Sequence, residues 1–225
     1  MKRLAALACL LLLCLPSLAA LAADGLERCE AGIKAGDAAA CERALEQKPD
    51  DPEILRRLGN AYFHADRFLE SHPAYQAALR AAPNDAGLHY EYASLLVLIN
   101  EYHEGVREAE AAVKLAPDHR LSWALLATCY RMMKRPDQAI KATQRAASLG
   151  DRREAYTLAH AYGDGSDGLR RDPKQEARWL ERAALAGHVA AMDDLAELFA
   201  KGRPGIPADT AKSRYWHERA MAAVR

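Results

Sequence analysis

The histidines are the side chains of this sequence best suited to bind a metal or transfer protons near neutral pH. His64 and His72 are eight residues apart, and His89 and His103 are fourteen apart. Neither spacing gives the paired ligands on one helical face that a zinc motif such as His-Glu-x-x-His requires. We therefore interpret these histidines as surface or groove residues and expect no metal site.

Residues 162–172, YGDGSDGLRRD, place acidic side chains among glycines, as calcium-binding loops do. An EF-hand loop starting at Asp164 would need an acidic third residue and a glutamate as the twelfth, but Ser166 and Gln175 occupy these positions. The calcium pattern fails, and the glycines are better explained as a turn between two helices.

The sequence also lacks a motif for nucleophilic catalysis. The sequence contains no Gly-x-Ser-x-Gly elbow, and Cys129 has no evident histidine partner. Adjacent carboxylates such as Asp193 and Asp194 are expected on solvated helix faces. The sequence therefore predicts a protein that is not an enzyme and has no cofactor, although an active site assembled across distant segments would escape a motif search.

Residues 1–22 have the pattern of a secretory signal peptide. Two basic residues precede an apolar run over residues 4–15, and Ala20 and Ala22 place small side chains where a signal peptidase cleaves. The run is shorter than the ~20 residues of a transmembrane helix. We expect cleavage after Ala22 and a periplasmic protein, with a membrane-anchored chain as the open alternative.

Charge excludes one class of partner. The chain has 31 basic and 31 acidic residues, and removal of the signal would take away two basic residues and no acid. A nearly neutral chain with interspersed charges gives no basic patch for nucleic acid or for an anionic membrane surface.

Three cysteines would remain after cleavage. Cys29 and Cys41 flank a predicted turn at Gly36 and Asp37, which would place them level on two antiparallel helices. We expect a disulfide between them in an oxidising compartment, with two buried free thiols as the alternative. Cys129 is interpreted as a small buried hydrophobic residue.

The elements that would position any site repeat at an offset of 34 residues. A proline ends each second helix, small residues recur where two helices of a hairpin cross, and a large residue fills the space between hairpins. The prolines are Pro49, Pro83 and Pro117. The small residues form two sets, Gly59, Ala93 and Ala127 on the first helices and Ala78, Ala112 and Ala146 on the second. The large residues are Tyr62, Leu96 and Tyr130. The pattern resembles the tetratricopeptide repeat family.

The period changes after residue 150. Tyr162 matches Phe199, and Gly165 matches Gly202, at an offset of 37 residues. Together with the segment RWLERAALAGH, which ends at His188, these positions resemble the Sel1-like repeat, a longer relative of the same hairpin.

The two resemblances imply an all-α fold, a right-handed α-solenoid of stacked helix-turn-helix repeats with about twelve helices. The expected organisation is a signal peptide at residues 1–22, a degenerate hairpin at 23–50, three tetratricopeptide units at 51–151 and two Sel1-like repeats at 152–225.

In tetratricopeptide arrays the first helix of each hairpin lines a concave groove, which here would bind an extended segment carrying an acid and an apolar anchor. Carried over position by position, the predicted groove residues are Arg56, Arg57, Asn60, Phe63, His64, Tyr90, Glu91, Ser94, Val97, Ala124, Thr128, Arg131 and Met132.

The resemblance thus predicts a non-catalytic scaffold of the bacterial cell envelope that binds another protein or a peptide. Two alternatives stay open. One is an envelope protein that binds or hydrolyses cell-wall compounds, and the other is a structural subunit of a secretion, pilus or envelope complex that docks through the region of Trp216.

Overall fold

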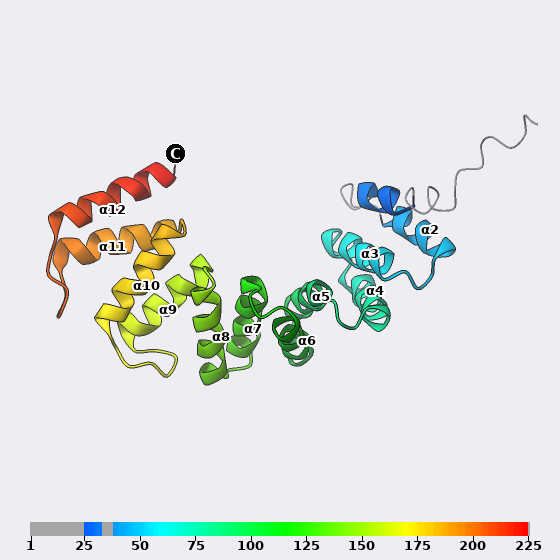
Figure 1. The fold of residues 1–225 in the computed structure, drawn as a ribbon, viewed down its shortest axis with the longest axis horizontal. Coiled ribbons are helices and arrows are strands. Elements are labelled where there is room, and N and C mark those ends of the chain that lie inside the picture. Colours follow the sequence, from blue (N-terminus) through cyan, green and yellow to red (C-terminus); the bar gives the residue numbers. More distant parts are fainter. Residues whose placement is uncertain (1–24, 33–37, 225) are drawn as a thin grey trace, which may run out of the picture. The chain divides into compact units, whose positions relative to one another are not determined.

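A computed structural model describes residues 25–32 and 38–224 (Figure 1). Residues 25–32 are helical, and eleven further helices follow. They are α2 (Ala39–Gln47), α3 (Pro52–His64), α4 (Phe68–Ala81), α5 (Ala86–Leu98), α6 (Tyr102–Leu115), α7 (Arg120–Met132), α8 (Pro136–Ser148), α9 (Arg152–Asp164), α10 (Pro173–Leu185), α11 (Val189–Lys201) and α12 (Thr210–Ala223). The predicted signal peptide and the predicted turn at Gly36 and Asp37 lie outside the described residues.

The prediction of an all-α solenoid of stacked hairpins is confirmed. Within the described residues there is no strand, and the one β-type pairing is an isolated bridge between Arg203 and Ile206. Helices α2 to α12 are 9 to 14 residues long, and each packs against at least one neighbour in sequence, as expected when a lone hairpin cannot bury its own apolar stripe.

Aspartates fix where many of the helices begin. The side chains of Asp51, Asp85, Asp151, Asp172 and Asp209 each accept a hydrogen bond from backbone N–H groups in the first turn of the helix that follows. These contacts satisfy donors that have no partner within the helix.

The turns inside the 34-residue repeats share a backbone conformation. Asp66, Asn100 and Lys134 have positive φ angles of 57°, 65° and 56° and follow one another at the repeat offset. A left-handed residue is therefore part of the repeat, although it is not a glycine in any of these three turns.

The chain divides into two compact units, Met1–Pro83 and Asn84–Arg225. In the first unit the helix at residues 25–32 is joined to α2 by a disulfide between Cys29 and Cys41. Both cysteines are fully buried beside Leu58 and Ala61 of α3. The boundary between the units falls after the first predicted tetratricopeptide unit, not at the change of repeat length.

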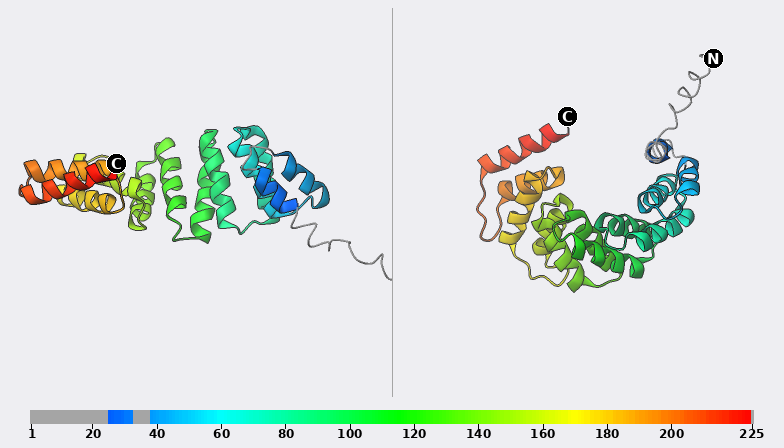
Figure 2. Two further views of the ribbon diagram at one scale, coloured as in Figure 1. Left: turned by 90° about the horizontal axis from the view of Figure 1, so that it is seen from above. Right: turned by 45° about the vertical axis from the view of Figure 1, so that its right-hand side comes forward.

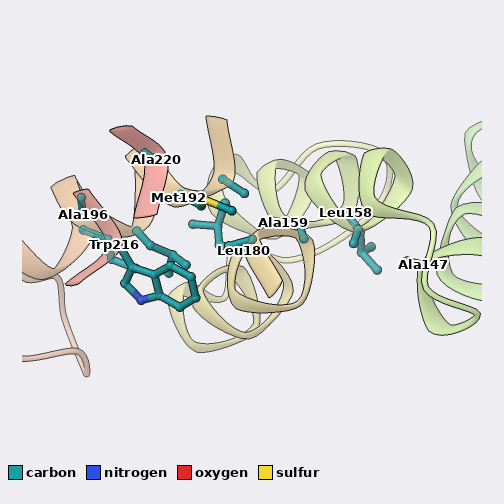
Figure 3. Close-up of a cluster of buried hydrophobic side chains, with 14 residues drawn as sticks. Ala147, Leu158, Ala159, Leu180, Met192, Ala196, Trp216 and Ala220 are labelled. Carbon is teal, nitrogen blue, oxygen red and sulfur yellow. The ribbon is translucent and has the colours of Figure 1, made fainter. Parts of the chain in front are cut away.

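The second unit holds four hairpins, α5–α6, α7–α8, α9–α10 and α11–α12, each packed against the next (Figures 1 and 2). Its largest apolar cluster lies between the last two hairpins and includes Leu158, Leu180, Met192 and Trp216 (Figure 3). Trp216 is only 4% exposed, so this side chain stabilises the last hairpin and is not itself a docking surface.

None of the helices in the described part of the chain is long and apolar enough to span a bilayer.

Candidate functional site

The predicted groove residues of α3 lie in the first unit, and internal contacts hold most of them. Arg57 pairs with Glu53 at 2.7 Å and with Glu30 at 3.0 Å. Asn60 accepts a hydrogen bond from the hydroxyl of Tyr75. These polar groups stabilise the packing of the unit.

The remaining α3 residues form a small aromatic group. The ring of Phe63 packs edge-to-face against His64, with a centroid separation of 5.6 Å, and against Phe68 of α4 at 6.0 Å. Arg56 is half-buried, and His64 is exposed.

The second unit contains a cavity of about 660 Å³ lined by three successive first helices, α5, α7 and α9. The lining residues are Tyr90, Arg120, Leu121, Ala124, Leu125, Thr128, Gly150, Asp151, Arg152, Arg153, Glu154 and Ala186. The volume falls in the range of about 300 to 1,000 Å³ typical of ligand pockets. We call this feature the first-helix cavity.

Three predicted groove residues, Tyr90, Ala124 and Thr128, meet in the first-helix cavity. The Tyr90 ring packs edge-to-face against His119, with centroids 5.1 Å apart, which holds the ring at the wall. The Ser94 hydroxyl donates to the carbonyl oxygen of Tyr90 at 2.8 Å and does not line the cavity.

Glu91, Val97 and Met132 also lie outside the cavity lining. Glu91 and Val97 are half-buried on α5, whereas Met132, at the end of α7, is exposed.

Arg131 is not a free cation of the groove. Its guanidinium donates to both carboxylate oxygens of Glu154, at 2.9 and 3.0 Å, and to the hydroxyls of Thr143 and Thr128, both at 3.1 Å. The hydrogen bonds to Glu154 raise the pKa of Arg131 above its ordinary value. The residue therefore forms part of the frame behind the cavity.

The cations that do face the first-helix cavity are Arg120, Arg152 and Arg153, which sequence reasoning missed. Arg120 is the first residue of α7, and Arg152 and Arg153 are the first two residues of α9. Their positions at the starts of predicted helices are a signal in the sequence. Basic residues at a helix N-terminus oppose the helix macrodipole and are disfavoured there, so their presence calls for an explanation.

A second cavity, of about 320 Å³, lies between α9, α10 and α11, and its charges are largely compensated. Glu176 is bound by Arg203 at 2.5 and 2.6 Å, and Glu197 by Lys201 at 2.5 Å. We therefore regard the first-helix cavity as the better candidate for binding a charged ligand.

Other side chains that could react or bind a metal have structural roles. Burial raises the pKa of the Cys129 thiol to about 11, which disfavours the thiolate that a nucleophile requires. In the glycine-rich segment, Asp164 accepts a hydrogen bond from the backbone N–H of Ser166 at 2.9 Å. No group of acidic, histidine or cysteine side chains suited to a metal ion occurs in the part of the chain that the structure describes.

Three protein-family models match the chain, over four ranges. Tetratricopeptide repeat models match residues 52–85 and 90–155, and the Sel1 repeat model matches residues 155–188 and 189–223.

Individual proteins show the same similarity. The mouse (Mus musculus) tetratricopeptide repeat protein 21B is 31% identical over 118 residues, which are 49% of this chain and 9% of that protein. The chain thus spans only a small part of this curated relative.

Among solved structures, a Sel1 repeat protein from Oxalobacter formigenes is 23% identical with a TM-score of 0.64, over 91% of this chain and 87% of that one. The pilF protein of Pseudomonas aeruginosa is 16% identical with a TM-score of 0.66, over 90% and 88%. At these identities the likeness shows a shared fold.

Proposed function

Because the chain belongs to the tetratricopeptide and Sel1 repeat families, whose repeats generally mediate protein–protein interaction, we propose that it is a non-catalytic scaffold that binds another protein through an extended segment. The first-helix cavity is the proposed binding site. The observation that carries this proposal is that three consecutive hairpins contribute to one cavity of about 660 Å³.

The wall of the cavity combines features that suit a peptide. Tyr90, Leu121 and Leu125 offer apolar and aromatic surface, while Thr128 and the arginines offer polar groups. A segment laid across α5, α7 and α9 would contact several helices in fixed register, in the manner of peptides bound in the grooves of helical proteins.

Hydrogen bonds hold the frame behind the cavity together, which favours binding. Arg131 of α7, Thr143 of α8 and Glu154 of α9 form one hydrogen-bonded group, so the three helices are tied together without a ligand. A preformed site loses less conformational entropy on binding than one that must first be ordered.

We further propose that the protein works in the bacterial cell envelope, in the periplasm. The signal-peptide pattern of residues 1–22 supports this location. The disulfide between Cys29 and Cys41 supports it too, since such bonds persist in oxidising compartments.

Selection of peptides tests the binding site directly. A phage-displayed library of random twelve-residue peptides would be selected against the full chain, and the enriched peptides measured by fluorescence anisotropy. Leu121→Glu should weaken binding by about tenfold or more, because it places a charge on the apolar wall.

The matched control is Leu115→Glu on α6. Leu115 is 41% exposed and Leu121 is 40% exposed, but only Leu121 lines the first-helix cavity. The proposal is wrong if the two variants bind the selected peptides equally well, or if no peptide is enriched.

A further inference from the structure

We propose that the segment bound in the first-helix cavity is acidic, with carboxylates beside an apolar residue, and that Arg120, Arg152 and Arg153 bind those carboxylates. This inference rests on the proposed function and adds the chemistry of the partner. All three arginines are exposed and line the same cavity.

These three arginines differ from the others around them. Arg131 is paired with Glu154, and Arg145 with Asp118 at 2.9 Å. Within the described residues, by contrast, no ion pair involves Arg120, Arg152 or Arg153. Nη1 of Arg152 donates a hydrogen bond to the carbonyl oxygen of Gly187 at 3.4 Å.

The two acids that line the cavity are held by hydrogen bonds and form no ion pair with these arginines. Asp151 Oδ1 accepts hydrogen bonds from the backbone N–H groups of Arg153 and Glu154, both at 3.0 Å. Glu154 accepts hydrogen bonds from the guanidinium of Arg131 and, at 2.8 Å, from the hydroxyl of Thr143. Among the lining residues, three arginines form no ion pair, whereas Glu154 is bound by Arg131 and Asp151 caps the first turn of α9, so positive groups are in excess.

Helix stability does not explain where the arginines stand. Arg120, Arg152 and Arg153 occupy the first turns of α7 and α9, where the positive end of the macrodipole disfavours a cation. The same two helix ends favour a carboxylate held nearby. The arrangement reduces the stability of the protein without a ligand and suits an anionic ligand. Functional sites often reduce stability in this way.

A peptide fits these observations better than a nucleic acid does. Phosphate backbones are bound by cations arrayed along an extended surface, and the chain as a whole has a formal net charge of zero. Here the three arginines line a cavity that Tyr90 and Leu125 also line. A short stretch with carboxylates and one apolar side chain matches both kinds of lining residue.

The test uses three fluorescein-labelled twelve-residue peptides with the same central leucine and tyrosine. They differ only in four flanking positions, which are all glutamate, all glutamine or all lysine. We expect the glutamate peptide to bind at least tenfold more tightly than the glutamine peptide, with a difference that shrinks as salt is added. The lysine peptide and a twelve-nucleotide single strand of DNA should bind more weakly still.

The triple variant Arg120→Ser/Arg152→Ser/Arg153→Ser should lose about tenfold in affinity for the glutamate peptide, as expected for three exposed ion pairs. Its melting temperature should stay the same or rise, because cations leave two helix N-termini. The control Arg214→Ser removes an exposed arginine of α12 that does not line the cavity, and should bind like the unmodified protein.

Equal binding of the glutamate and glutamine peptides would overturn the inference and leave the proposed function standing. Preferential binding of the DNA strand would overturn it as well. If none of the probes binds while library-selected neutral peptides do, the cavity binds a segment of another chemistry. If Leu121→Glu has no effect on any selected peptide, the proposed function itself fails.

Discussion

The guanidinium of Arg131 and the carboxylate of Glu154 form a two-pronged ion pair, 2.9 and 3.0 Å long, between α7 and α9. Thr143 of α8 donates to the same carboxylate at 2.8 Å. The pair therefore links the last 34-residue hairpin to the first of the longer repeats. Three helices meet at this one carboxylate, directly behind the first-helix cavity.

Breaking this pair should destabilise the second unit. Arg131→Met leaves the Glu154 side chain, which is 8% exposed, without its partner. We expect a loss of about 3 kcal/mol in the free energy of unfolding, measured by urea denaturation followed by circular dichroism. The double variant Arg131→Met/Glu154→Leu should lose less than the two single variants together, because it removes both charges. Strict additivity would contradict the prediction.

Stability at alkaline pH should depend on Tyr130. Burial, together with a hydrogen bond to Glu110, raises the pKa of Tyr130 to about 12. An unfolded tyrosine has a pKa of about 10, so the contribution is fully present below pH 10 and is lost as pH rises through about 12. We expect Tyr130→Phe to lose less stability than the unmodified protein between pH 10 and 12, in urea unfolding at successive pH values.

The control for this experiment is Tyr215→Phe, since Tyr215 is 47% exposed on α12. Its stability should follow that of the unmodified protein across the same pH range. If the two variants show the same pH dependence, buried Tyr130 is not the group responsible.

The repeat pattern was sufficient to predict the fold, because each position in a hairpin has a steric requirement that shows in residue type. Gly59, Ala93 and Ala127 are all buried where two helices cross. The family matches over residues 52–223 follow from the same positions. The left-handed conformation of the turn residues was not predictable from the repeat, because lysine, which stands at position 134, is not a residue type typical of such turns.

The candidate site was only partly predictable. Tyr90 and Thr128 line one cavity, because helical register fixes the face on which they lie. The role of Arg131 was not predictable, since its partner Glu154 lies 23 residues away, across the change of repeat length. Arg120 and Arg152 were missed because exposed arginines at helix starts look like solvated surface in a sequence.

There is room for a Cβ atom at Gly105 but not at Gly59, although both glycines lie buried in helices. A Cβ atom added at Gly59 would stand 2.9 to 3.1 Å from three ring atoms of Tyr75, whereas one at Gly105 would have neighbours at 3.4 Å and beyond. Gly59→Ala should destabilise the first unit by about 1 to 3 kcal/mol through overpacking. Gly105→Ala should be neutral or stabilising by up to about 1 kcal/mol, because alanine favours the helix.

Thermal unfolding of both glycine variants by calorimetry would distinguish them. A lower melting temperature for Gly59→Ala and an unchanged or higher one for Gly105→Ala is the expected result. A greater loss of stability in Gly105→Ala than in Gly59→Ala would contradict this prediction.

Loss of the disulfide should weaken the first unit alone. Cys29 and Cys41 are 12 residues apart, and closing a loop of this size stabilises a chain by about 3 kcal/mol in the entropic model. In a stack of hairpins each unit contacts only its neighbours, so the loss should not reach α9–α12. In the variant Cys29→Ser/Cys41→Ser, hydrogen exchange should become faster in α2 and α3 and stay unchanged in α9–α12. A reducing agent should reproduce this pattern in the unmodified protein and change nothing in the variant; faster exchange throughout the chain would show instead that the two units unfold together.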